Sequence, residues 1–225
     1  MEQDLWLQRL FDRVELVNGV GSRSAGKMCV MSFVASLAGE KETDAPRCAS
    51  PVIRTFAILI NDQMPGDVRQ RLKPFAPCIV GTNDGLDEAR VEILRRALVE
   101  EILPRLSRFP ASAGATPGRA GPIAFLWFHM LHRRIDQLLN QGESRRRRPG
   151  HAVQMASAAG SLLGFCARDA RNADEKEWYW RTAIGLLDRL CEVGMPERQR
   201  APGQRADRLA WLVERDGQRG RPAVT

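Results

Sequence analysis

The chain has 225 residues, of which 44% are hydrophobic and 27% are charged, and its formal net charge is +7. This composition is typical of a globular protein and excludes an intrinsically disordered chain. No apolar run reaches the roughly 20 residues that a membrane-spanning helix needs. The length suits one hydrophobic core, or one domain with an appendage.

The first predicted element is an amphipathic helix over residues 4–17, which the Asn18–Gly19 pair ends. The next segment, residues 19–26, is rich in glycine and precedes Lys27, as in a phosphate-binding loop. Such a loop needs Ser or Thr after the lysine and an apolar strand before it, whereas this chain has Met28 and a predicted helix. We therefore interpret residues 19–26 as a connector between two helices.

The central block, residues 28–85, holds the longest apolar runs and the clearest helix boundaries. Between residues 27 and 38 the apolar side chains surround almost the whole predicted helix, which is typical of a helix inside a core. Gly39 suits its C-cap, and Ser50 followed by Pro51 suits the start of a second helix. We expect the two helices to bury Phe33, Leu37, Ile53, Phe56 and Ile60.

Short motifs also follow one another through the central block. A Cys-containing apolar helix leads to Leu-Ala-Gly-Glu, Asp-x-Pro, Cys-x-Ser-Pro-Val, Asn-Asp, an Arg/Leu/Pro segment and Gly-Thr, at residues 37–40, 44–46, 48–52, 61–62, 71–77 and 81–82. In this order they resemble a family of bacterial proteins that has no assigned activity. The resemblance covers about a quarter of the chain. It implies that the central block folds as one module, and it implies no particular chemistry.

The remainder of the chain is also predicted to be helical. A long helix covers residues 86–106, with Asp84 as its N-cap and Pro104 as a kink or end. Further helices are expected at residues 122–139, 152–168, 174–193 and 205–213. The sequence thus predicts an all-α globular bundle of roughly eight helices, as one body or as two packed helical subdomains. The expected parts are an N-terminal module (1–108), a linker (109–121), a C-terminal module (122–214) and a flexible tail (215–225).

The five cysteines indicate a reducing environment. Their number is odd, no Cys-x-x-Cys pair occurs, and Cys29, Cys166 and Cys191 lie in apolar helical contexts. This pattern favours buried free thiols over a disulfide framework. The acidic start of the sequence lacks the apolar segment of a signal peptide, so we expect a cytoplasmic protein.

Four polar residues of the central block are candidates for catalysis: Glu40, Asp44, Asn61 and Asp62. A carboxylate whose pKa is raised by its neighbours can act as a general acid or base. The alternative is that these side chains cap helices and brace turns. If the two central helices pack antiparallel, the first two residues lie at the opposite end from the last two, and they cannot form one site. If the connector between the helices folds back, the four residues could form one site.

Two further groups suggest binding. His129 and His132 are three residues apart on one predicted helix, which is a spacing of metal ligands, or else they form a polar stripe beside Arg133 and Arg134. A run of four arginines follows in an exposed loop, where it either contacts phosphate groups or is simply solvated. The run consists of Arg145, Arg146, Arg147 and Arg148.

Because the sequence contains no strong catalytic or cofactor motif, we expect no cofactor and hold three hypotheses about function. The leading one is a non-enzymatic helical interaction protein, an accessory part of a bacterial assembly, with a protein partner and no membrane contact. The second is a nucleic-acid-binding accessory protein that uses the Arg145–Arg148 loop together with Arg133 and Arg134. The third is an enzyme with carboxylate or metal chemistry near Glu40, Asp44 and Asp62.

Overall fold

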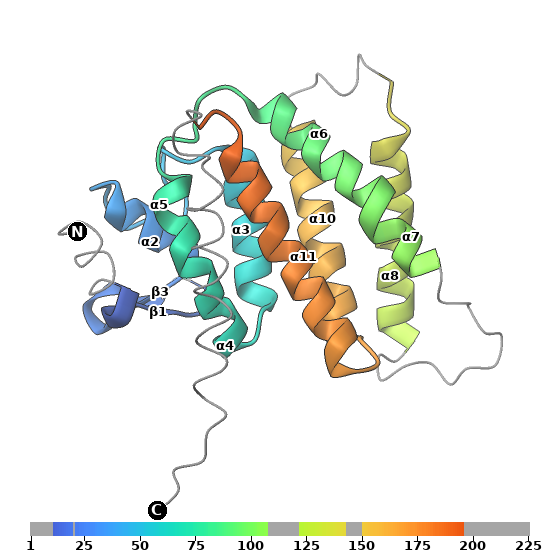
Figure 1. Ribbon diagram of the computed structural model, residues 1–225, viewed down its shortest axis with the longest axis horizontal. Coiled ribbons are helices and arrows are strands. Elements are labelled where there is room, and N and C mark those ends of the chain that lie inside the picture. Colours follow the sequence, from blue (N-terminus) through green and yellow to red (C-terminus); the bar gives the residue numbers. More distant parts are fainter. Residues whose placement is uncertain (1–10, 20, 108–121, 143–149, 196–225) are drawn as a thin grey trace, which may run out of the picture. The chain divides into compact units, whose positions relative to one another are not determined.

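The computed structural model describes residues 11–19, 21–107, 122–142 and 150–195 (Figure 1). The chain divides into two units, residues 1–193 and residues 194–225. All helices and strands given below belong to the first unit. Among the helices that are described, none combines the length and the apolar character needed to cross a membrane.

A small sheet comes first in the described chain. Its strands are β1 (Glu15–Leu16), β2 (Gly21–Ser22) and β3 (Lys27–Met28), in the order β1-β3-β2, with β1 parallel and β2 antiparallel to β3. A 3-10 turn, η1 (Arg23–Ala25), lies between β2 and β3.

This sheet corrects the prediction for residues 4–17. Residues 11–13 are helical, but the chain is extended at β1, so the predicted helix is wrong in its last part. The Gln70 side chain causes the difference, because its amide donates to the Leu16 carbonyl (2.8 Å) and accepts from the Leu16 N–H (3.0 Å). These bonds satisfy the backbone of Leu16 without a helix, while the Leu16 side chain is fully buried.

Both predicted central helices form, but the first begins later than predicted, because Lys27 and Met28 belong to β3. The two helices are α2 (Val30–Leu37) and α3 (Pro51–Gln63). Ser50 caps α3, since its Oγ accepts from the N–H groups of Val52 and Ile53, and the Cys29 Sγ accepts from the Ser32 N–H at the start of α2. Of the side chains expected in the core, Leu37 is only partly buried. The others are fully or almost fully buried: Phe33, Ile53, Phe56 and Ile60.

Short helices then lead to the predicted long one. They are α4 (Gly66–Arg69), η2 (Gln70–Phe75) and α5 (Ala76–Ile79). The long helix is continuous but consists of three parts, α6 (Asp87–Ala97), a π-helical turn η3 (Leu98–Ile102) and α7 (Leu103–Ser107). The π turn ends two residues before Pro104, whose missing N–H removes one bond from the helical ladder. The N-cap of α6 is Leu86, and not Asp84 as predicted.

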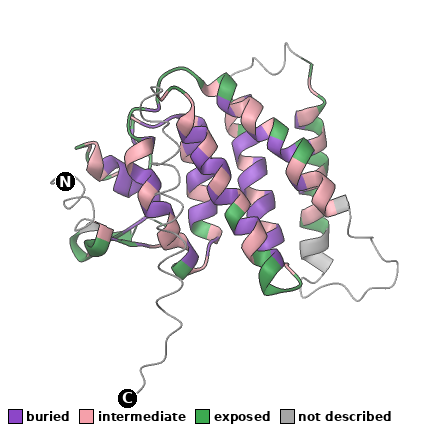
Figure 2. Ribbon diagram, in the orientation of Figure 1, coloured by how far each residue is buried: buried purple, intermediate pink, exposed green. Residues whose placement is uncertain are grey.

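Helix α10 (His151–Arg168) packs against α3, α6, α8 (Pro122–Leu139) and α11 (Ala173–Glu192). Buried residues gather along α3, α10 and α11 (Figure 2). The predicted linker, residues 109–121, lies outside the described residues, but helices from both sides of it pack together in the first unit. The protein is therefore predominantly helical, as its sequence predicts.

Two glycines allow α10 to lie close to α3. A Cβ atom at Gly160 would be 3.1 Å from the Leu59 Cβ, and one at Gly164 would be 2.3 Å from the side-chain amide of Gln63. That amide fills the space, and its Nε2 donates to the carbonyls of Leu59 (2.9 Å) and Gly160 (3.4 Å). The contact between the two halves of the sequence therefore depends on missing side chains.

This contact can be tested by Gly160→Leu. The new side chain would force α3 and α10 apart, so the free energy of unfolding should fall by about 1–3 kcal/mol or more. Gly185→Leu is the matched control, because a Cβ at Gly185 in α11 meets no atom within 4 Å. Denaturant unfolding should rank Gly160→Leu as clearly less stable than Gly185→Leu, and equal stability of the two would contradict the close contact.

Candidate functional site

Glu40 braces the connector between α2 and α3. Its carboxylate accepts the backbone N–H groups of Arg47 (2.8 Å) and Cys48 (2.9 Å). These two bonds lower the pKa of Glu40. Asp44, the second acidic candidate on this connector, is exposed. Glu40 therefore holds a loop closed at the start of α3.

Asn61 and Asp62 brace the opposite end of α3. The fully buried Asn61 accepts the Val30 N–H through Oδ1 (3.2 Å) and donates to the Val17 carbonyl through Nδ2 (2.9 Å). The Asp62 Oδ1 accepts from Asn61 Nδ2 and from the Gly19 N–H, each at 3.0 Å. These bonds fasten the sheet region and the start of α2 to α3.

The four catalytic candidates thus fall into two separate places. Because α2 and α3 are antiparallel, Glu40 and Asp44 belong to the end near Ser50, about eleven residues and roughly 16 Å of helix away from Asn61. The contacts of Glu40, Asn61 and Asp62 are mostly with backbone groups. They correspond to the bracing role that was the alternative to catalysis. The structure does not bring the four residues into one site.

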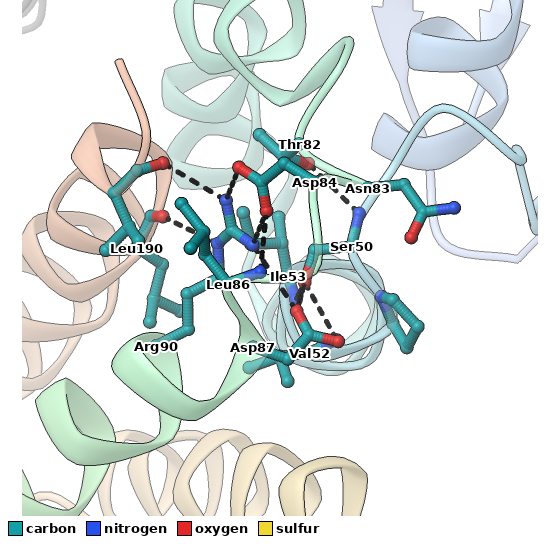
Figure 3. A network of polar contacts seen from close by, with 12 residues as sticks. Ser50, Val52, Ile53, Thr82, Asn83, Asp84, Leu86, Asp87, Arg90 and Leu190 are labelled. Carbon is teal, nitrogen blue, oxygen red and sulfur yellow. Dashed lines mark hydrogen bonds and ion pairs between the residues drawn. The ribbon is translucent and has the colours of Figure 1, made fainter. Parts of the chain in front are cut away.

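A buried cation, Arg90, lies near the Ser50 end of α3 (Figure 3). The Arg90 side chain is fully buried and forms a two-pronged ion pair with Asp84, with distances of 2.7 and 2.8 Å. Its Nε donates to the Leu190 carbonyl (3.2 Å) and its Nη2 to the Val193 carbonyl (3.1 Å). Asp87 approaches Nη1 at 3.4 Å and also accepts from the Ser50 hydroxyl, which caps α3.

We call Arg90, Asp84, Asp87 and Ser50 the Arg90 cluster. It joins the start of α3, the turn before α6 and the end of α11. Every group in it has a partner within the protein, so its arrangement is that of a structural tie and not of a reactive centre. The hydrogen bonds from Arg90 are the main cause of the lowered pKa of Asp84. Sequence reasoning missed this cluster, although the spacing of 84, 87 and 90 by three residues was a signal.

None of the five cysteines takes part in a disulfide. Cys29, Cys166 and Cys191 are buried, whereas Cys48 and Cys78 are partly exposed. Burial raises the pKa of the Cys166 thiol to about 12, and it also raises the pKa of Cys48. A protonated thiol is a weak nucleophile, so neither cysteine suits covalent chemistry at neutral pH.

The histidine pair lies on α8. The His132 Nδ1 is 3.1 Å from the Asp136 Oδ2, and His129 is exposed. Among the residues that the structure describes, no group of three or more His, Cys, Asp or Glu side chains is arranged to hold a metal ion. Arg133 and Arg134 are exposed beside the pair. The arginine run, Arg145–Arg148, lies outside the described residues.

A groove of about 560 Å³ runs between α8 and α10. Its lining on α8 is Trp127, Met130, Leu131, Arg133, Arg134 and Gln137, and its lining on α10 is Ser157, Ala158 and Ser161. We call it the α8 groove. The rings of Phe128 and Phe165, with centroids 5.5 Å apart, join the two helices.

The outer face of α8 is unusually apolar for an exposed surface. Leu126 is 62% exposed, Trp127 53% and Met130 64%. The inner face of the same helix is also apolar, and it buries Leu131, Ile135 and Leu138. Sequence reasoning predicted this helix, at residues 122–139, but did not distinguish its two apolar faces. The signal that it missed is the consecutive apolar run at residues 125–128, which is too wide for a single helical face.

Comparisons of this chain with protein-family models, with curated proteins and with solved structures find no match.

The Arg90 cluster predicts a specific dependence of stability on pH. The pKa of Asp84 is lowered in the folded protein, so its ion pair stabilises the fold above the ordinary Asp value of about 3.9. That contribution is lost as the pH falls through the lower, folded-state pKa. Asp84→Asn should reduce the free energy of unfolding at neutral pH by up to about 3 kcal/mol, and less at acid pH.

Denaturant unfolding at neutral pH and near pH 3 measures this difference. Asp44→Asn, at an exposed position, serves as the control and should change stability by less than about 0.5 kcal/mol at either pH. A loss for Asp84→Asn that is equally large at both pH values would contradict the ion pair.

Thiol titration predicts two classes of cysteine. In the native protein a water-soluble thiol reagent should label only the partly exposed Cys48 and Cys78, because the other three are shielded from solvent, and the raised pKa of Cys48 should slow its labelling. In denaturant under non-reducing conditions all five should react. Mass spectrometry of the labelled peptides would assign the sites, and labelling of Cys166 in the native state would contradict its burial.

Proposed function

We propose that this protein is a non-enzymatic interaction protein that binds another protein through the α8 groove and the adjoining outer face of α8. The supporting observation is the exposure of Leu126, Trp127 and Met130 beside a groove that two arginines also line. Contiguous apolar side chains on a surface are typical of sites that a partner covers. The proposal keeps the leading hypothesis from the sequence and gives it a location.

The residue types of the α8 groove support recognition of a protein. Aromatic residues, Met and Arg are enriched in the cores of protein interfaces, and Trp and Arg dominate among the residues that contribute most to affinity. Trp127 and Met130 lie one helical turn apart, so a partner would cover both together. Burying them removes apolar surface from water, which is the main driving force of such association.

The same lining offers little for catalysis. Its polar groups are the hydroxyls of Ser157 and Ser161, the amide of Gln137 and the two guanidinium groups. A serine nucleophile needs a neighbouring general base, and the described residues that line the groove include no His, Asp, Glu or Cys. The α8 groove is thus better suited to holding a ligand than to breaking a bond.

The test is site-specific photo-crosslinking in the producing cells. A photoreactive residue in place of Gln137, at the groove, should capture one identifiable protein, which is then purified for binding measurements. The double variant Trp127→Ala/Met130→Ala should bind that protein at least about 30-fold more weakly than the wild type. Leu86→Ala is the matched control, because Leu86 is 42% exposed but does not line the groove, and it should bind normally.

Two results would overturn the proposal. One is that no protein is captured at residue 137 above the level captured from a photoreactive residue at position 86. The other is that the captured protein, once purified, binds Trp127→Ala/Met130→Ala as tightly as it binds the wild type.

A further inference from the structure

The lining of the α8 groove changes from apolar to cationic along α8. Its apolar end holds Trp127 and Met130, and its cationic part begins one turn later with Arg133 and Arg134. From Trp127 to Gln137 the helix rises about 15 Å, or nearly three turns. The opposite wall consists of the small residues Ser157, Ala158 and Ser161 of α10. Small side chains there leave room for another chain to approach.

We infer that the α8 groove takes an acidic amphipathic helix from a different protein. This inference rests on the proposed function and specifies the partner's chemistry. Apolar side chains three or four residues apart on such a helix would contact Trp127 and Met130. Carboxylates about one turn further along would pair with Arg133 and Arg134, and guanidinium–carboxylate pairs would then fix its direction in the groove.

Charge complementarity carries the argument. Among the described residues that line the groove, both charged ones are arginines and none is acidic. Asp136 is the nearest carboxylate along α8, but its Oδ2 lies 3.1 Å from the His132 Nδ1 and it is not part of the lining. A partner without negative charge would remove water from the two guanidinium groups and offer them no anionic group in return, which is unfavourable.

The same charges argue against a second copy of this chain. In a symmetric dimer each groove would face the other, so the two arginine pairs would lie in one interface to which the described lining contributes no carboxylate. Nucleic acid would satisfy the arginines, but it would leave Leu126 and Met130 in water, because aliphatic side chains do not stack on bases as aromatic ones do. An acidic amphipathic helix satisfies both parts of the surface.

The experiment uses the full chain and two synthetic probes. Both are fluorescein-labelled helical peptides of about 18 residues, roughly five turns, with a leucine stripe. One carries Glu beside the stripe, and the other carries Lys at the same positions. Fluorescence anisotropy at low salt, about 50 mM, gives their affinities for the wild type and for variants. The wild type should bind the Glu peptide at least about tenfold more tightly than the Lys peptide.

The decisive variant is Arg133→Glu/Arg134→Glu, which should reverse this preference. The matched control is Arg96→Glu/Arg181→Glu, which makes the same change in net charge at two exposed positions outside the groove. It should still prefer the Glu peptide, as the wild type does. A non-specific charge effect would act equally in the two variants and would reverse the preference of both. Trp127→Ala/Met130→Ala should lower the affinity for the Glu peptide by about tenfold or more.

Several outcomes would overturn the inference. The first is that Trp127→Ala/Met130→Ala binds the Glu peptide as tightly as the wild type does. The second is that Arg133→Glu/Arg134→Glu still binds the Glu peptide more tightly than the Lys peptide. The third is that the control variant also reverses the preference. Binding of duplex DNA that depends on Arg133 and Trp127 would assign the groove to nucleic acid, and a dimer abolished by Trp127→Ala/Met130→Ala would assign it to a second copy. The proposed function fails separately, through the crosslinking experiment, so a Trp127-dependent partner with a neutral binding segment would overturn only this inference.

Discussion

Burial of the Arg90 guanidinium is the constraint on which the arrangement of the helices depends. A cation out of water is stable only when acceptors surround it, and here they come from Asp84, Asp87 and two carbonyls at the end of α11. Asp87 in turn holds the Ser50 hydroxyl that caps α3. One side chain therefore couples three segments, and moving any one of them would leave a charge or a carbonyl unsatisfied.

Close packing of α10 determines which surfaces remain open. Gly160 and Gly164 let α10 lie against α3, and the Phe128–Phe165 contact attaches α8 to another side of α10. Among the side chains of α8 whose burial is described, the buried ones lie on its inner face: Leu131, Ile135 and Leu138. Its outer face stays apolar without a covering element among the described residues, and this is the basis of the proposed binding role.

The sequence predicted those features that local chemistry determines. The Ser50 cap, the apolar circumference of α2 and the ends of α10 and α11 follow from residue type and spacing. It did not predict β1, because the backbone of Leu16 is held by Gln70, far away in the chain. The α8 groove escaped prediction for a related reason, since periodicity shows that a helix has two apolar faces but not which one a neighbouring helix covers.

Many of the bracing side chains bind the main chain of their targets. Glu40 accepts from backbone N–H groups, Asn61 bonds to the backbone of Val17 and Val30, and Arg90 reaches the carbonyl of Val193. Every amino acid supplies a carbonyl, and all but proline supply an N–H. Over evolutionary time the contacted positions, such as 47, 17 and 193, can therefore change identity while the brace persists. The side chains that make these contacts are harder to replace. Asp at position 40 would lack the reach of Glu40, and Lys at position 90 would lack the forked guanidinium of Arg90.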